Sequence, residues 1–334
     1  MPSRPPPSAL ARATTLPPRC YVDPAFYAQE VERVFRREWL CVAREDELPA
    51  PGDYLAFTLL DEPLVAVRDD DGAIRVLSRV CRHRWMPVVE GRGNRRSFQC
   101  PYHLWTYGLD GRLIGAPDME RAEGFSRADC ALTALRVETW LGFVFVSFDP
   151  QAAPLAPRLA GLERIVAPYR PEEMRTGEPL VFEHAWNWKV MVENFVESYH
   201  HAGVHPDTLQ PLVPGSGTWA EDADGPWIAL HNPTGDGAPI PPLLPDTPGL
   251  DDAQRARFVV GAVLPFHLFS VQRDSLVWYR LEPLAVDRIA LRIHLCARSS
   301  DDPAHAQRLA DLRGWLAHLH GQDMAACAGV QAGL

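Results

Sequence analysis

Apolar residues follow two different spacings in the first half of the chain. Between 24 and 38 they recur at helical spacing, directly after Asp23 and Pro24, a pair that suits the N-cap and the first turn of a helix. From 53 to 146 the apolar runs are short and are separated by Asp-Gly turn pairs. This pattern predicts one helix followed by a small all-β domain, whose last strand we expect at 139–150.

The second half of the chain mixes both spacings. A strand-to-helix stretch at 180–201 precedes a segment rich in Pro, Gly and Asp at 206–248. Strand-like runs return around 258–298, and an Ala- and Leu-rich helical stretch covers 302–334. The order of these elements predicts an α+β domain with an antiparallel sheet and a long C-terminal helix.

Chain length and proline content set the expected domain limits. A chain of 334 residues exceeds the size at which one hydrophobic core usually stops growing. Prolines gather in the first nineteen residues, and a change to Pro and Ala follows residue 150. We therefore expect a disordered tail at 1–20, a first domain at 21–150 and a second domain at 151–334.

Charge and cysteine content exclude several classes of protein. A formal net charge of -10 argues against nucleic-acid binding, which needs a surplus of Lys and Arg. Seven scattered cysteines make a poor disulfide framework and favour a reducing, cytoplasmic location. The N-terminal stretch has no apolar core of a secretion signal, and no run is apolar enough to predict a membrane span.

Two short motifs in the first domain combine cysteine with histidine. Cys81-x-His83 and Cys100-x2-His103 are separated by sixteen residues, so each loop offers one thiolate and one imidazole. A structural zinc site would more often pair its cysteines within one loop, and four core residues without metal would require both spacings to coincide by chance. A Rieske [2Fe-2S] centre, in which two thiolates bind one iron and two imidazoles bind the other, needs this division of ligands.

Residues around the two motifs refine this prediction. Met86 and Tyr102 occupy the positions where respiratory-chain Rieske centres carry an additional disulfide. Without it the cluster resembles the type with a low potential, near the lower end of the range from about -150 to +300 mV. A local group of arginines either forms a solvated basic face or steers an acidic redox partner to the cluster; its members are Arg82, Arg84, Arg92, Arg95 and Arg96.

A second group of candidate ligands lies in the second domain. Glu197 and His200 are three residues apart and would share one face of a helix. Five residues of helix would turn His205 away from His200, so both can bind one ion only if the helix stops between them. Gly203 and Pro206 suit such a stop.

Two imidazoles need a carboxylate to complete the facial triad of a ferrous iron site. Asp323 is the best candidate because it stands alone among small and apolar residues of the C-terminal helix, although a surface aspartate is the alternative. Glu193 and Asp207 are weaker substitutes. His201 is adjacent to a ligand in sequence and is expected behind the metal site or at the surface.

Together these motifs resemble the α subunits of Rieske non-haem iron ring-hydroxylating oxygenases and their demethylase and choline-type monooxygenase relatives. The resemblance covers residues 21–334. It implies a β-sandwich-like Rieske domain followed by a helix-grip, START-like catalytic domain. It also implies that the cluster is held by Cys81, His83, Cys100 and His103, and the mononuclear Fe²⁺ by His200, His205 and Asp323.

The resemblance further implies how the two centres cooperate. Family members are typically homotrimers in which a carboxylate carries electrons between subunits, and Glu197 takes that position here. Many relatives have an aspartate there, one residue further from the preceding Asn194. The chain also stops eleven residues after Asp323, where relatives usually continue, which bears on packing over the substrate pocket.

The expected function is that of a terminal oxygenase component. Electrons from NAD(P)H would pass through a separate reductase or ferredoxin to the cluster, and then through His103, Glu197 and His200 to the iron. The substrate would be a small aromatic or quaternary ammonium compound that is hydroxylated or demethylated. The alternative is a Rieske electron-transfer or ligand-binding protein that has lost catalysis. Aromatic residues that either line a pocket or belong to the core are Trp219, Trp227, Phe266, Phe269, Trp278 and Tyr279.

Overall fold

A computed structural model of the protein describes residues 13–334. Most of the tail expected to be disordered lies outside the described residues, but Arg19–Val22 (α2) form a short helix. The described part of the chain divides into two compact units, Arg36–Ala153 and a second one that joins residues 13–35 to Pro154–Leu334. None of the described helices has the length and apolar character that crossing a membrane requires.

The unit Arg36–Ala153 is built from three antiparallel sheets. Its largest sheet has the strand order β4-β3-β2-β5, and two three-stranded sheets have the orders β1-β10-β9 and β6-β7-β8. The strands are Leu40–Arg44 (β1), Asp53–Leu59 (β2), Glu62–Arg68 (β3), Ile74–Ser78 (β4), Arg92–Asn94 (β5), Phe98–Gln99 (β6), Thr106–Tyr107 (β7), Leu113–Gly115 (β8), Arg136–Trp140 (β9) and Phe143–Ser147 (β10). The predicted all-β character of this region is therefore confirmed.

The expected single strand at 139–150 is wrong in detail. The chain turns back at Leu141 and Gly142, whose φ angles are 47° and 82°, so that β9 and β10 pair as a hairpin. Glycine adopts a positive φ without steric cost, and this property permits the tight turn. The apolar residues on either side hid the turn, because Trp140 at the end of β9 and the residues of β10 are buried.

The second unit is centred on an eight-stranded antiparallel sheet. Its order is β11-β18-β17-β16-β15-β14-β13, and β12 pairs with β18. The strands are Arg175–Thr176 (β11), Leu180–His184 (β12), Trp219–Ala220 (β13), Trp227–Pro233 (β14), Arg257–Val263 (β15), His267–Val271 (β16), Ser275–Ala285 (β17) and Arg288–Ala297 (β18). This antiparallel sheet with its accompanying helices confirms the predicted α+β class.

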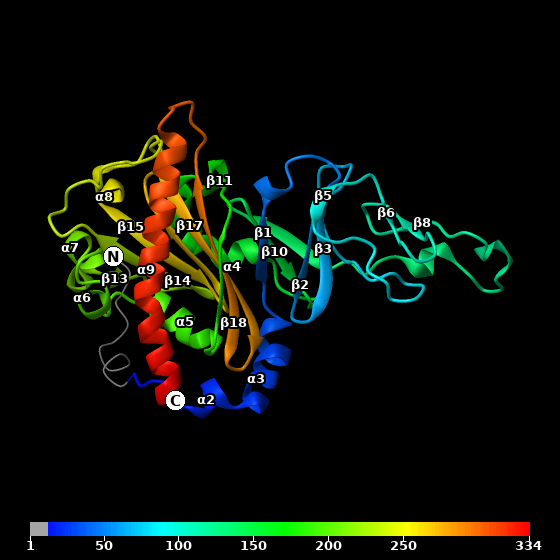
Figure 1. The fold of residues 1–334 in the computed structure, drawn as a ribbon, viewed down its shortest axis with the longest axis horizontal. Helices are drawn as coiled ribbons and strands as arrows, with labels where there is room; N and C mark the ends of the chain where they lie inside the picture. Colours follow the sequence, from blue (N-terminus) through cyan, green and yellow to red (C-terminus); the bar gives the residue numbers. More distant parts are fainter. Residues whose placement is uncertain (1–12) are drawn as a thin grey trace. The chain divides into compact units, whose positions relative to one another are not determined.

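One long helix, His305–Gly333 (α9), runs across this sheet and contacts α5 and α6 (Figure 1). The other α-helices of the unit are Leu155–Val166 (α4), Trp188–Phe195 (α5), His201–Val204 (α6), Leu209–Leu212 (α7) and Asp252–Arg255 (α8). Asn187 caps α5, since its side chain accepts a hydrogen bond from the backbone N–H of Lys189 at 3.0 Å. The space between α5, α6, α9 and the sheet contains the second group of candidate ligands.

The N-terminal helix forms where the sequence predicts it. Asp23 accepts a hydrogen bond from the backbone N–H of Ala25 at 2.8 Å, and the helix Pro24–Glu30 (α3) continues as a π-helical turn, Val31–Phe35. We expected this helix in the first domain, but its contacts place it in the second unit.

Long-range packing explains that difference. The ring of Phe35 meets those of Trp188 and Phe266 edge to face, with centroids 5.3 and 5.1 Å apart. Lys189 Nζ lies 2.7 Å from Glu30 Oε1, and both side chains are about nine-tenths buried. Local sequence spacing carries no information about such contacts across more than 150 residues.

Candidate metal centres

The two Cys-His motifs occupy two loops with the same backbone design. The N–H of Trp85 donates to the carbonyl of Cys81, and the N–H of Leu104 donates to that of Cys100, each at 3.0 Å. Trp85 and Leu104 have positive φ angles of 56° and 61°. The repeated turn presents one cysteine and one histidine from each loop in equivalent places.

The four side chains form a thiol pair and an imidazole pair. The Cys81 thiol lies close enough to Cys100 to raise the pKa of the Cys100 thiol, and the rings of His83 and His103 have centroids 4.6 Å apart. Within residues 13–334, Nδ1 of each histidine is buried without a hydrogen-bond partner. Two unpartnered imidazole nitrogens beside two buried thiols fit the donor set of a Rieske cluster.

Burial controls the protonation of these groups. Burial raises the pKa of the Cys100 thiol, and contact with Cys81 adds to this effect. Burial also lowers the pKa of His83, with smaller contributions from the charges of His103 and Arg84. The imidazole is thereby kept neutral, which is the form that binds a metal.

Two aromatic residues support the first loop. The ring of Trp105 stacks on His83 at a centroid distance of 4.9 Å. The Tyr107 hydroxyl lies 3.3 Å from Cys81 Sγ and accepts a hydrogen bond from the backbone N–H of Arg82 at 3.0 Å. Its own proton is therefore available to the sulfur, and such contacts tune a metal-bound thiolate.

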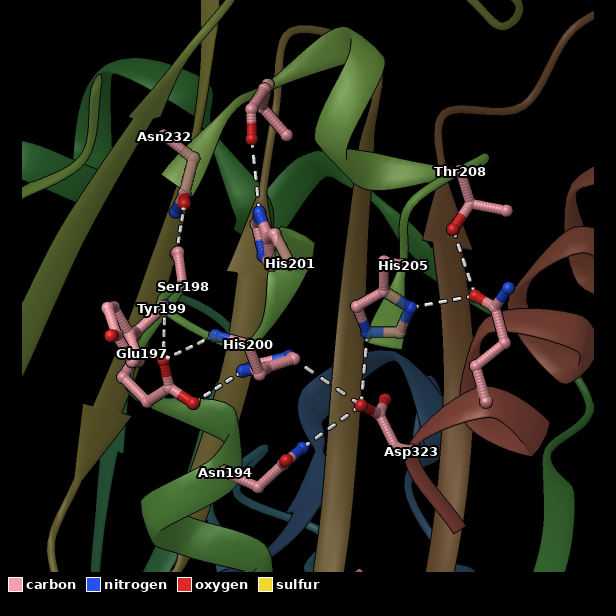
Figure 2. A network of polar contacts seen from close by, with 12 residues as sticks. Asn194, Glu197, Ser198, Tyr199, His200, His201, His205, Thr208, Asn232 and Asp323 are labelled. Carbon is pink, nitrogen blue, oxygen red and sulfur yellow. Dashed lines mark hydrogen bonds and ion pairs between the residues drawn. The ribbon is translucent and has the colours of Figure 1, made fainter. Parts of the chain in front are cut away.

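In the second unit His200, His205 and Asp323 converge on one point. One possible ligand atom from each lies within 4.8 Å of the others. Asp323 Oδ1 is 3.0 Å from His205 Nε2 and 3.7 Å from His200 Nε2, and Figure 2 shows both rings turned towards the carboxylate. Two imidazole nitrogens and one carboxylate oxygen thus lie on the same side of the position where a metal ion would bind. This arrangement fits the facial triad of a ferrous site.

The local backbone differs from the expected helix. Helix α5 ends at Phe195, so Glu197 and His200 lie in the following turn and do not share a helix face. The short helix α6 then occupies His201–Val204, between His200 and His205. The helix therefore stops before His200 and again after Val204, and this double interruption lets both rings reach Asp323.

Each of the two candidate histidine ligands is oriented through its Nδ1 by a different oxygen. His200 Nδ1 donates to Glu197 Oε1 at 2.5 Å, and His205 Nδ1 donates to Gln322 Oε1 at 2.7 Å. The hydroxyl of Thr208 donates to the same Gln322 oxygen at 2.9 Å. These bonds hold Nδ1 of each ring away from the metal point, so Nε2 is the atom that faces it.

Glu197 is predicted from its sequence position, whereas Gln322 and Thr208 are not. Only the position of Gln322 next to Asp323 could have drawn attention to it, because neither residue belongs to a spaced motif. Asn194 was also missed as a partner, and its side-chain amide donates to Asp323 Oδ1 at 3.2 Å (Figure 2).

Hydrogen bonds shift the pKa values of Glu197 and His205 against the effect of burial. Burial opposes ionisation of Glu197, but hydrogen bonds and the charge of His200 hold the pKa of Glu197 below its usual value. Burial likewise works against protonation of His205, yet hydrogen bonds to Asp323 and Gln322 raise its pKa. The site therefore favours an ionised carboxylate at Glu197.

The weaker ligand candidates have other partners or lie elsewhere. Glu193 accepts a hydrogen bond from the Tyr21 hydroxyl at 2.8 Å, and Asp207 is exposed. His201 is buried, not at the surface, and its Nδ1 donates to the carbonyl of Val213 at 3.1 Å. Among the residues that the structure describes, the only group of three or more possible ligands whose ligand atoms all lie within 4.8 Å of one another is the one containing Asp323.

A cavity of about 140 Å³ opens beside these ligands. Its aromatic lining residues are Phe195, Phe258, Tyr279 and Trp315. Of the six aromatic residues considered from the sequence, Tyr279 alone lines this cavity. Phe266, Phe269, Trp278 and Trp227 are core residues, whereas Trp219 is 43% exposed.

Comparisons with known proteins match both units. Residues 38–135 match the family model described as Rieske [2Fe-2S] domain, and residues 171–334 match the one described as ring hydroxylating alpha subunit (catalytic domain). Each match contains one of the two ligand groups described above.

Several curated proteins and solved structures are similar to the chain. The glycine betaine monooxygenase oxygenase subunit of Chromohalobacter salexigens is 38% identical over 201 residues, which cover 60% of this chain and 45% of that protein. The carnitine monooxygenase oxygenase subunit of Escherichia coli is 34% identical over 197 residues, covering 58% and 53% of the two chains. The chain thus spans about half the length of these relatives. A quaternary ammonium Rieske monooxygenase structure superposes with a TM-score of 0.84 at 25% identity, over 96% of this chain and 85% of that chain.

The fold and the two matches define a two-domain iron protein with a Rieske domain and a catalytic non-haem iron domain. The chain belongs to the Rieske non-haem iron oxygenase family, in the group of the α, or oxygenase, subunits. The cofactors of these domains are a [2Fe-2S] cluster and a mononuclear iron.

Proposed function

We propose that the protein is the terminal oxygenase component of a multicomponent system that hydroxylates or oxidatively demethylates a small organic substrate. The convergence of His200, His205 and Asp323 beside a cavity carries this proposal. The rival function, a Rieske electron-transfer or ligand-binding protein without catalysis, has no need for a triad that opens on a cavity.

The residues of the triad would hold Fe²⁺ through two Nε2 atoms and one carboxylate oxygen. When bound, a ferrous ion with three ligands on one side supplies open positions for dioxygen activation. Glu197 and Gln322 orient the two imidazoles, and the apolar wall near Tyr279 excludes bulk water from the cavity.

We propose that Cys81 and Cys100 bind one iron of the cluster and that His83 and His103 bind the other. The pairing of thiol with thiol and imidazole with imidazole supports this division. A single zinc ion would instead require all four ligands to meet at one point.

We further propose that the working form is a homotrimer in which Glu197 receives electrons from the cluster of a neighbouring copy through the histidine that corresponds to His103. The side chain of Glu197 is 41% exposed although it is bonded to His200. Next to it Tyr199 is 96% exposed, and Trp85 on a cluster loop is 78% exposed. Large exposed aromatic residues at both centres suit burial between subunits.

The electron donor in this proposal is a reductase or ferredoxin that draws on NAD(P)H. The arginine group predicted from the sequence is exposed, which fits a docking site for an acidic redox protein. A cytoplasmic location remains part of the proposal. All seven cysteines are free, as expected for a chain without a disulfide framework.

The substrate class follows from the relatives and the cavity. Relatives are named for glycine betaine, carnitine and biphenyl, so the proposal includes quaternary ammonium and aromatic compounds. An aromatic wall that includes Trp315 and Tyr279 suits both, because a ring face attracts a cation as well as another ring.

Selective loss of each metal centre would test the assignment. Asp323→Ala should abolish mononuclear iron while preserving the reduced-cluster signal in electron paramagnetic resonance, and Cys100→Ser should do the reverse. Asp207→Asn, an exposed carboxylate close to the ligands in sequence, is the matched control and should retain both metals.

Function itself is tested by oxygen uptake with a generic reductase and a panel of aromatic and methylammonium compounds. The proposal predicts uptake that depends on both substrate and Asp323. Iron retained in full by Asp323→Ala, or a wild-type protein that binds iron without any substrate-dependent uptake, would contradict it.

A further inference from the structure

Gln272 lies where two cavities meet. It stands in the turn between β16, which ends at Val271, and β17, which begins at Ser275. Gln272 lines both the 140 Å³ cavity beside the metal ligands and a neighbouring cavity of about 460 Å³. Leu212 and Trp315 are the other residues that line both. Gln272 is therefore placed to contact a molecule in either cavity.

The orientation of the Gln272 amide is fixed by its neighbours. Its Nε2 donates to Asp274 Oδ1 at 3.1 Å and to Ser275 Oγ at 2.9 Å. The Ser275 hydroxyl donates its only proton to Asp274 Oδ1 at 3.1 Å, so its oxygen must accept from the amide. Both amide protons of Gln272 are thus used.

Asp274 makes the reverse orientation unfavourable. The residue is only 2% exposed, and its Oδ2 accepts hydrogen bonds from the backbone N–H groups of Leu243 and Leu244 at 2.8 and 3.1 Å. A flipped amide would turn the oxygen of Gln272 towards this carboxylate, and two acceptors would then face each other. Oε1 of Gln272 is consequently left as an acceptor with no partner among residues 13–334.

The smaller cavity carries other groups that could accept a hydrogen bond, among them the hydroxyls of Ser270 and Tyr279, so the variants below must separate Gln272 from them. Its wall is largely apolar and aromatic, and its two acidic residues are the metal ligand Asp323 and the histidine partner Glu197. A volume near 140 Å³ is close to that of an engineered cavity of about 150 Å³ that holds one benzene molecule. The cavity therefore suits a single ring or a group of similar size with one polar end.

We infer that Gln272 Oε1 accepts a hydrogen bond from a hydroxyl or N–H group of the substrate and so selects small substrates that carry such a donor. A methyl group in the same place would leave the oxygen desolvated and unpaired, a penalty that gives strong discrimination between otherwise equal ligands. The inference rests on the proposed function only in taking this cavity as the substrate site.

Calorimetric binding to the iron-loaded protein tests the inference without turnover. Two matched pairs exchange a hydroxyl for a methyl group: phenol against toluene, and choline against propyltrimethylammonium. For at least one pair we expect the hydroxyl compound to bind about tenfold or more tightly. Equal affinities within both pairs, or no saturable binding by either hydroxyl compound, would overturn the inference.

Variants then assign the preference to this side chain. Gln272→Met has a similar shape without the oxygen and should reduce the preference to less than about twofold, with unchanged affinity for the methyl compound. Ser270→Ala lines the same cavity and should keep the wild-type preference. A preference that survives in Gln272→Met would also overturn the inference. Iron content and oxygen uptake report on the proposed function separately, so a protein that passes those tests without discriminating between the pairs refutes only the subsite.

Discussion

Replacing Gln322 with leucine should weaken iron binding although Gln322 is not itself a metal ligand. Its Oε1 accepts hydrogen bonds from His205 Nδ1 at 2.7 Å and from the Thr208 hydroxyl at 2.9 Å. The side chain of His205 is only 2% exposed, so water cannot easily replace the lost acceptor. The variant would leave the Nδ1 proton unsatisfied and would free the ring to rotate or to change its tautomer.

The expected loss of iron affinity depends on which hydrogen bonds each variant removes. Removal of a partner that orients a histidine ligand typically lowers metal affinity by about 10- to 100-fold, or about 1.4 to 2.7 kcal/mol. Thr208→Val removes one donor to Gln322 and leaves its contact with His205 in place. We therefore expect the Thr208 variant to change affinity by less than about threefold, which makes it the graded control.

The assay is anaerobic competition for Fe²⁺ between the protein and a chelator of known affinity. Thermal unfolding of the two metal-free variants provides the comparison of fold stability. An iron affinity of Gln322→Leu within about twofold of wild type would refute the reasoning, since the bond to His205 would then contribute almost nothing. An equal loss in Thr208→Val would show that loop packing, and not the bond to His205, determines the affinity.

Three further predictions concern stability. Lys189→Met leaves the nine-tenths-buried Glu30 without its partner at 2.7 Å and should cost about 3 to 5 kcal/mol in denaturant unfolding, with partial recovery when Glu30→Gln is added; a loss below about 1 kcal/mol would contradict this. Burial, aided by the charge of a neighbouring histidine, lowers the pKa of His320 to about 4, so the unfolded state binds more protons between about pH 6.5 and 4. As the pH is lowered from about 6.5 to 4, the free energy of unfolding should therefore fall by up to about 3 kcal/mol. In His320→Leu this contribution to the pH dependence of the unfolding free energy should be absent. Gly261→Ala would drive a methyl group into a buried phenyl ring and should destabilise the protein by at least about 1 to 3 kcal/mol, whereas Gly314→Ala, in open space on α9, should raise the melting temperature through a gain of about 0.5 to 1 kcal/mol.

Sequence spacing was sufficient to select the residues that the structure brings together. The ligand candidates form short-range patterns, namely the C-x-H and C-x2-H motifs and the pair His200 and His205. Each kind of metal centre accepts only a few residue types as ligands, which narrows the choice of candidates. Asp323 lies more than a hundred residues from the histidines. The sequence alone still shows it as an isolated acidic residue on an apolar helix. Their assignment as ligands remains a proposal that the iron and cluster measurements test.

Features that depend on orientation could not be predicted. Residues 196–201 contain neither Gly nor Pro, and only the three-dimensional contacts show that the helix ends at Phe195. The roles of Gln322 and Gln272 rest on which atom of an amide faces which neighbour, and no periodicity encodes that choice. The same holds for Phe35, whose packing against Trp188 assigns the N-terminal helix to the second unit.

The unequal partners of the two histidine ligands have an electrostatic explanation. In the proposed site, the carboxylates of Asp323 and Glu197 would supply two negative charges against one divalent cation. A carboxylate at the position of Gln322 would add a third negative charge close to Asp323, and like charges at short range in a site of low dielectric are costly. A neutral amide orients His205 without that cost. The carboxylate is placed instead at Glu197, whose 41% exposed side chain can keep its charge partly solvated and can meet a second molecule.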